Sequence, residues 1–347
     1  MRNTYSIRRY QYVLLLAFFS FSSIVAQSFQ KTATGVIAKI QTMDVEVQFY
    51  SPSIVRVLKS PEGFKYTKES LSVIKKPEPT KLKIKQLGDV VSMKSDKLEV
   101  DLNLVTGKVS YFDLNEKVLF TEKDNGTKFT PIMDVNKKSY TVRQSFKLDE
   151  DESIYGLGQI QNGKLGIRNQ QVILKNSPSK VCFPYFLSMK GYGKFWDNYS
   201  ATTFTDDKNE TSMESLGDCS DYYFMYGGSP NGVVPQLRDL TGHAPMFPLW
   251  TFGYWQSKER YKNQKELMEV VAKYRELNVP LDGIIQDWQY WGKNNLWNDM
   301  KWDTTTFPDP KGMADFVHKN NAHLAVVAWP GFGVDTKQYA EFKSKKC

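Results

Sequence analysis

The feature that most constrains the fold of this chain is a change in hydrophobic period near Pro248. Before that residue, apolar and polar side chains alternate in short runs such as VEVQFY (45–50) and KLEVDLNL (97–104). Alternation with period two, interrupted by Gly, Asn and Pro turns, is typical of antiparallel strands with one buried and one solvated face. We therefore predict that residues 27–235 form an N-terminal β-sandwich domain.

After Pro248, strands alternate with helices. The expected elements are a strand at 251–257, a helix at 264–278, a strand at 281–288, a helix at 312–321, a strand at 323–330 and an amphipathic piece at 336–346. Apolar strands separated by helices indicate right-handed βαβ units around a parallel sheet. About three such units are present, whereas a closed parallel barrel requires eight strands. We expect residues 236–347 to form the first part of a (β/α)8 TIM barrel, with the barrel incomplete at Cys347.

The loops that follow these three strands contain most of the tryptophans. Segments 256–261, 287–303 and 329–335 carry five of the eight Trp residues of the chain. Ligands of parallel sheets bind at the carboxyl ends of the strands, where these loops lie. The flat faces of indole rings pack well against the apolar faces of a sugar. A core rich in large aromatic rings is the alternative explanation.

The N-terminus has the order of a secretory signal. Arg2, Arg8 and Arg9 precede an apolar run at 12–26 that ends in small residues. The run is too short for a spanning helix, so we predict a signal peptide at 1–26, cleaved after Ala26. The mature protein is then secreted or periplasmic and not bound to a membrane, with a membrane anchor as the alternative.

Charge and cysteine content exclude several classes of function. The net charge of +8 includes the three arginines of the predicted signal, and the lysines are interspersed with acidic residues. No basic face with stacking rings is evident, so we expect no nucleic-acid partner. The three cysteines and three histidines have no metal-ligand spacing, so we expect no metal and no cofactor. Whether Cys182 and Cys219 pair stays open.

Five segments, in order and at sensible spacing, resemble glycoside hydrolase family 31. They are IYGLGQ (154–159), PMFPLWTFGYWQSKERY (245–261), VPLDGIIQDWQYW (279–291), MKWDTTTFPDPKGM (300–313) and HLAVVAWPGF (323–332). The resemblance implies a galactose-mutarotase-like β-sandwich followed by a (β/α)8 barrel. It also implies retaining hydrolysis of terminal α-xylosyl or α-glucosyl residues of oligosaccharides or polysaccharides. The rings around Asp287 resemble the α-xylosidase branch, so xyloglucan fragments are expected substrates alongside α-glucosides.

A retaining glycosidase requires two carboxyl groups roughly 5–5.5 Å apart. The resemblance places the nucleophile and the acid/base on later barrel strands, beyond Cys347, so the catalytic residues are unknown and we expect the chain alone to be inactive. WNDM (297–300) is a near-copy of the family's nucleophile pattern, Trp-x-Asp-Met-Asn-Glu. However, Lys301 and Trp302 follow it, and it lies in a loop. We therefore do not predict Asp299 to be the nucleophile.

The resemblance assigns substrate binding to Asp287, Trp288, Trp291, Trp329 and Arg260. Asp287 ends an apolar strand and matches the family aspartate that bonds sugar hydroxyls, while Trp329 matches a position lining the same pocket. Trp288 and Trp291 are candidates for stacking, and Arg260 departs from the apolar residue of some α-xylosidases. A loop-capping role for Asp287, core packing for Trp329 and an orientation of Trp288 toward the helices are the alternatives.

Two other functions are compatible with the sequence. One is a non-catalytic carbohydrate-binding protein derived from such an enzyme, and the other is a structural β-rich secreted protein. The oligomeric state stays open.

Overall fold

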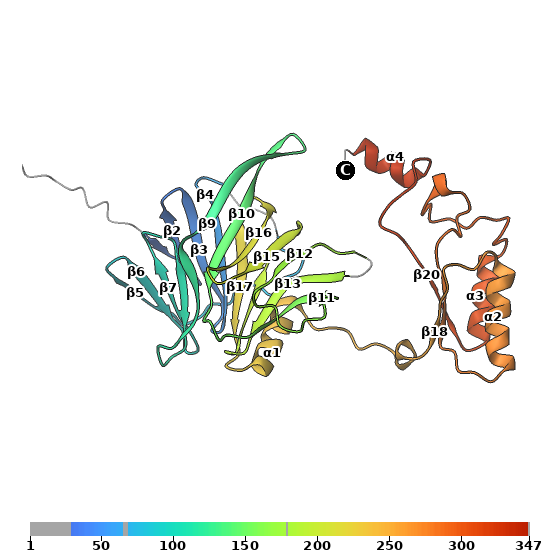
Figure 1. Cartoon of the computed structure of the whole chain (residues 1–347), viewed down its shortest axis with the longest axis horizontal. Coiled ribbons are helices and arrows are strands. Elements are labelled where there is room, and N and C mark those ends of the chain that lie inside the picture. The colour runs from blue at the N-terminus through green and yellow to red at the C-terminus, as the bar shows by residue number, and fades with distance from the viewer. Residues whose placement is uncertain (1–28, 65–68, 178–179, 346–347) are drawn as a thin grey trace, which may run out of the picture. The chain divides into compact units, whose positions relative to one another are not determined.

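The computed structural model describes residues 29–64, 69–177 and 180–345 (Figure 1). The chain divides into two compact units, with the boundary in the sequence between Ala244 and Pro245. The predicted signal peptide, residues 1–26, lies outside the described residues. Among those that are described, no helix has the length and apolarity needed to cross a membrane.

The first sheet of the N-terminal unit is antiparallel. Its strands are β1 (Phe29–Lys31), β2 (Gly35–Ile40), β3 (Met43–Ser51), β4 (Ile54–Pro61), β11 (Ile154–Ile160), β13 (Lys180–Ser188), β14 (Tyr192–Trp196) and β17 (Ser220–Tyr226). Their order across the sheet is β1-β2-β3-β4-β17-β14-β13-β11, so β4 pairs with a strand more than 150 residues later in the chain.

The second sheet is also antiparallel and packs against the first. Its strands are β5 (Lys83–Leu87), β6 (Val90–Lys94), β7 (Glu99–Asn103), β8 (Val109–Phe112), β9 (Val118–Asp134), β10 (Lys137–Lys147), β12 (Gln171–Leu174), β15 (Thr202–Asp206) and β16 (Thr211–Gly217). Their order is β12-β15-β16-β10-β9-β8-β7-β6-β5. The predicted β-sandwich is confirmed.

The core between the two sheets follows the predicted alternation. In β3, Val45, Val47 and Phe49 are fully buried, whereas Glu46 and Gln48 between them are partly exposed. Aromatic rings from both sheets fill the centre of this core, with Tyr111 stacked on Phe224 at 3.9 Å between ring centroids. Removal of these apolar side chains from water is the main force that holds the sheets together.

The IYGLGQ motif forms a bulged edge strand. In β11, the pairing with β13 shifts register between Gly156 and Gly158, and both glycines have positive φ angles. A Cβ atom would lie 2.4 Å from the Tyr185 carbonyl oxygen at Gly156 and 2.0 Å from that of Val181 at Gly158. Both positions therefore require glycine, and the bulge directs Leu157 into the core.

A helix ends the first unit where the sequence predicted only strands. Helix α1 (Pro230–Thr241) begins at an N-cap, Ser229, whose hydroxyl accepts a hydrogen bond from the Gly232 N–H. Pro230 suits the first helical turn, since its missing N–H has no partner there in any helix. The predicted domain boundary after Pro235 lies inside this helix.

The second unit is built around a parallel sheet. Its elements are the 3₁₀ turn η1 (Leu249–Phe252), β18 (Trp255–Gln256), α2 (Gln264–Glu276), β19 (Gly283–Gln286), the 3₁₀ turn η2 (Asn294–Leu296), α3 (Pro310–Lys319), β20 (His323–Val326) and α4 (Lys337–Ser344). The strands lie in the order β18-β19-β20, and both pairs are parallel. The predicted βαβ units are confirmed, although each strand is shorter than expected.

Helices α2 and α3 cover one face of this sheet. Leu267, Val271, Met313 and Val317 are fully buried together with Ile284 of β19. On the other face, the Trp255 ring lies across Gly283 of β19, where a Cβ atom would be 2.2 Å from it. Both faces of the central strand are thus covered by apolar side chains.

Candidate binding site at the carboxyl ends of the parallel strands

Asp287 directly follows β19, at the end of the strand where ligands of parallel sheets bind. Its Oδ1 accepts a hydrogen bond from the Trp288 N–H at 2.7 Å, so part of the loop-capping alternative holds. Its Oδ2 has no hydrogen-bond partner in the part of the chain that the structure describes, and the residue is half-buried. The preceding Gln286 is fully buried and donates to the Tyr261 carbonyl at 3.2 Å. Asp287 therefore has a rigid support and one oxygen available for a ligand.

Arg260 and Trp288 come from neighbouring loops and contact one another. The Arg260 guanidinium carbon lies 4.7 Å from the centroid of the Trp288 ring, at cation–π distance. The Trp288 indole N–H donates to Glu259 at 2.6 Å, and Glu259 also pairs with Arg260 at 3.0 Å. Glu259 was not among the binding residues expected from the sequence. These contacts hold one face of Trp288 against the loop that follows β18.

Trp297 is the centre of the tryptophan cluster, although it was not among the binding residues expected from the sequence. Its ring centroid lies 5.4 Å from that of Trp288, 5.2 Å from that of Trp291 and 5.5 Å from that of Trp329. The high density of Trp in the loops was the only signal that could have identified it. Through Trp297, the structure brings three of the predicted aromatic residues together.

Trp291 and Trp329 both contact Trp297 but differ in exposure. Trp291 is only 3 % exposed and packs edge to face against Tyr290, so it supports the cluster from the core and presents little surface to a ligand. Trp329 is 40 % exposed and lies three residues beyond β20. Of the two, Trp329 has the surface that a ligand needs.

Asp299 lies in a loop and does not directly follow a strand, as the sequence indicated. It is 8 % exposed and sits in the loop after η2, where its Oδ2 pairs with Lys301 at 3.2 Å. Its neighbours Asn298 and Met300 both have φ angles of 58°. The WNDM segment is therefore a tightly turned loop and does not present a nucleophile from a strand.

The groups at the strand ends suit a polyhydroxylated ligand. A carboxylate oxygen accepts charge-assisted hydrogen bonds from hydroxyl groups, and indole faces pack against C–H surfaces. Among the described residues, no cluster of three or more His, Cys, Asp or Glu side chains is placed to hold a metal ion.

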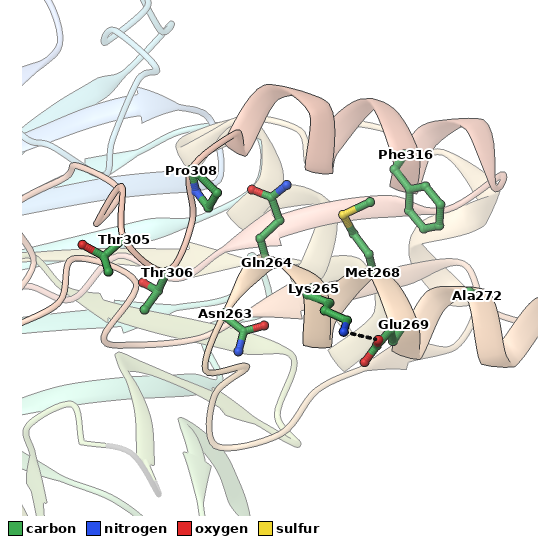
Figure 2. Close-up of a pocket in the computed structure, with 10 residues that line it drawn as sticks. All are labelled: Asn263, Gln264, Lys265, Met268, Glu269, Ala272, Thr305, Thr306, Pro308 and Phe316. Atoms are coloured by element: carbon green, nitrogen blue, oxygen red, sulfur yellow. Dashed lines mark ion pairs between the residues drawn. The ribbon is translucent and has the colours of Figure 1, made fainter.

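A separate groove of about 710 Å³ runs between α2 and α3 on the helical surface (Figure 2). Met268 and Phe316 form its apolar floor, and the Lys265–Glu269 ion pair lies at its rim, with 3.6 Å between the charged atoms. Asp287, Trp288 and Trp329 do not line it. The geometry at the strand ends, and not this groove, is the candidate site.

Comparison with known proteins places both units in one family. Residues 44–205 match the glycosyl hydrolase 31 N-terminal galactose mutarotase-like domain, and residues 244–347 match the glycosyl hydrolases family 31 TIM-barrel domain. The second unit is thus the start of a TIM-barrel domain.

Two relatives among characterised sequences illustrate the similarity. An α-xylosidase of Saccharolobus solfataricus is 38% identical over 325 residues, which cover 89% of this chain and 43% of that protein. Alpha-glucosidase 2 of Bacillus thermoamyloliquefaciens is 28% identical, over 84% of this chain and 38% of that protein. The chain spans less than half the length of either relative.

Solved structures show the same fold. A family 31 α-xylosidase from a soil metagenome, complexed with xylose, superposes with a TM-score of 0.82 at 25% identity, over 92% of this chain and 49% of that one. The α-xylosidase of Xanthomonas citri gives a TM-score of 0.79 at 23% identity, over 91% of this chain and 51% of that one.

Proposed function

The chain belongs to glycoside hydrolase family 31, and from this we propose that the protein containing it is a retaining α-glycosidase that releases terminal α-xylosyl or α-glucosyl residues from oligosaccharides or polysaccharides. The observation that carries the proposal is the Asp287 Oδ2 at a barrel strand end, which has no hydrogen-bond partner among the described residues, together with the exposed Trp329 three residues beyond the neighbouring strand. In this proposal Asp287 accepts hydrogen bonds from hydroxyls of the sugar to be released, and Trp329 and Trp288 line the same subsite. Arg260 orients Trp288.

We propose further that α-xylosides are preferred over α-glucosides. The relative that is 38% identical is an α-xylosidase, and a solved α-xylosidase with bound xylose has the same fold. The crowded tryptophan cluster beside Asp287 supports this preference, because xylose lacks the hydroxymethyl group of glucose and needs less room. Xyloglucan fragments with terminal α-xylose are then natural substrates.

The preference is measurable with the purified mature protein that contains residues 27–347. We expect kcat/KM for p-nitrophenyl α-D-xyloside to exceed that for the α-D-glucoside by about tenfold or more, since one carbon group in a shaped pocket discriminates by about 10–200-fold. The β-D-xyloside serves as the control and should not be cleaved. Equal rates on the two α-glycosides would contradict the preference, and cleavage of the β-xyloside would contradict the α-glycosidase assignment.

A second candidate is a non-catalytic carbohydrate-binding protein. It is favoured by the fact that each residue assigned above is proposed to contribute to sugar binding, and none is proposed as the nucleophile or as the acid/base. Saturable binding of D-xylose without turnover of either α-glycoside would select this function.

We also propose that the protein is exported, on the basis of the arginine-flanked apolar run at 12–26. Edman sequencing of protein recovered from the periplasm or the medium is expected to begin at Gln27. An intact Met1 in a membrane fraction would contradict export with cleavage and would favour the anchor.

A further inference from the structure

The side chain of Asn298 joins the loop after β19 to the loop after β20. Its Nδ2 donates to the Trp329 carbonyl at 2.5 Å, and its Oδ1 accepts from the Trp329 N–H at 3.3 Å. Both polar atoms of the amide therefore bond the backbone of one residue, as a neighbouring strand would. Asn298 is fully buried, so water does not compete for either bond.

The backbone around Asn298 is shaped for this contact. Its φ angle of 58° lies in the left-handed region, which Asn adopts more readily than most residues. Three further bonds close the same pair of loops. The Gly333 N–H donates to the Trp297 carbonyl at 2.9 Å, the Asn295 side chain donates to that of Asp335 at 2.5 Å, and the Asp335 N–H donates to the Asn295 carbonyl at 3.3 Å. A Cβ atom at Gly333 would lie 2.3 Å from the Asn295 carbonyl oxygen, so the loops approach as closely as glycine allows.

This junction determines where the Trp329 ring lies. Trp329 is 40 % exposed, and the one close aromatic neighbour of its ring in the described structure is Trp297, edge to face at 5.5 Å. Trp297 directly precedes Asn298 in the chain. A ring with so little packing of its own takes its position from its backbone, and Asn298 anchors that backbone.

We propose that Asn298 is a positioning residue for substrate binding: through its two bonds to Trp329, it holds the Trp297–Trp329 pair in the orientation that receives the sugar ring. This inference rests on the proposed glycosidase function. It gives the WNDM segment a role in binding in place of the nucleophilic role that its similarity to the family's nucleophile pattern would suggest.

The test uses the protein that contains the full chain and three variants. Asn298→Gly removes both bonds while keeping the left-handed backbone free of strain. Asn298→Asp keeps the acceptor for the Trp329 N–H and removes the donor. Asn321→Gly is the matched control, because Asn321 also has a positive φ angle, 51°, but its exposed side chain lies in the turn between α3 and β20.

We expect Asn298→Gly to raise KM for p-nitrophenyl α-D-xyloside about tenfold, the effect of about one net hydrogen bond, with kcat changed less than about twofold. Asn298→Asp should raise KM at least as much, because its buried carboxylate oxygen would face the Trp329 carbonyl oxygen. Asn321→Gly should leave KM unchanged. Because fixed tryptophan rings produce near-ultraviolet circular dichroism, Asn298→Gly should also reduce that signal. In a Trp329→Phe background, Asn298→Gly should add little, since both changes act on one ring.

Two results would overturn the inference while leaving the proposed function intact. One is a wild-type KM in Asn298→Gly, and the other is an equal effect of that change with and without the Trp329 ring. If the wild-type protein cleaves neither α-glycoside, the proposed function fails instead. The dichroism then still decides whether Asn298 holds Trp329, since an unchanged spectrum in Asn298→Gly contradicts it.

Discussion

Replacing Asp287 by Ala is expected to lower kcat/KM for the preferred α-glycoside by a factor of about 10² to 10³, in the protein that contains the complete barrel. The carboxylate has one oxygen engaged by the Trp288 N–H and one without a partner among the described residues. In the proposed site it accepts two hydrogen bonds from sugar hydroxyls, each charge-assisted and contributing about 1.5–3 kcal/mol, which allows a loss of this size or more.

Steady-state kinetics on Asp287→Ala and two companions provide the measurement. Asp287→Asn keeps the size and one neutral acceptor, so its activity should lie between those of the wild type and the alanine variant. Asp315→Ala is the matched control, because Asp315 pairs with Lys311 on the surface of α3, with 2.5 Å between charged atoms, away from the strand ends. Near-normal kinetics for Asp287→Ala would remove this residue from the site.

Replacing Glu122 by Ala is expected to destabilise the sandwich unit by about 3–5 kcal/mol, the usual effect of removing one partner of a buried ion pair. Glu122 accepts from Lys59 at 2.5 Å, from the Tyr222 hydroxyl at 2.9 Å and from the Val109 N–H at 2.8 Å. The Lys59 and Glu122 side chains are 1% and 0% exposed. Burial already lowers the pKa of Lys59, and Glu122 opposes that effect, so its removal leaves an uncompensated amine and two donors without partners.

Urea unfolding followed by hydrogen exchange of peptides from β4 and β9 measures this loss within the whole chain. The matched control is Glu62→Ala, which removes the exposed partner of Lys39 at 3.2 Å and should change stability by less than about 1 kcal/mol. Equal stability of Glu122→Ala and Glu62→Ala would show that the buried network does not stabilise the sandwich.

Removing a second buried charged residue of the sandwich, Lys194, is expected to have the opposite effect on stability. Lys194 is fully buried, and its ammonium lies 4.4 Å from the Phe146 ring and 4.7 Å from the Trp196 ring, with no carboxylate in salt-bridge range among the described residues. Burial lowers the pKa of Lys194 well below its usual value, so the folded state binds this proton less tightly than the unfolded state does. The resulting loss of stability is greatest at low pH and disappears as the pH rises through the unfolded-state pKa. Lys194→Met should therefore stabilise the unit where Glu122→Ala destabilises it.

Local pattern was sufficient to predict the layers of both units. The alternation of apolar and polar residues in one strand is enough to predict that Val45, Val47 and Phe49 face the core. The identity of the partner strand is not needed for that prediction. The alternation of apolar strands and helices after Pro248 is also a local pattern, and it was enough to predict the parallel sheet. That order also places Asp287 at a strand end, because chain direction alone determines which end of a parallel strand carries the next loop.

The sequence by itself thus determined the sandwich, the parallel sheet and the end of the sheet at which Asp287 and Arg260 lie. Only the tertiary structure decided which tryptophan is central, that Trp291 is buried and Trp329 exposed, and that Asn298 joins two loops 31 residues apart. Periodicity describes the environment of a residue relative to its own strand or helix. Contacts between loops depend instead on how elements that are distant in the sequence pack together. Neither the spacing of the tryptophans nor the WNDM pattern contains that information.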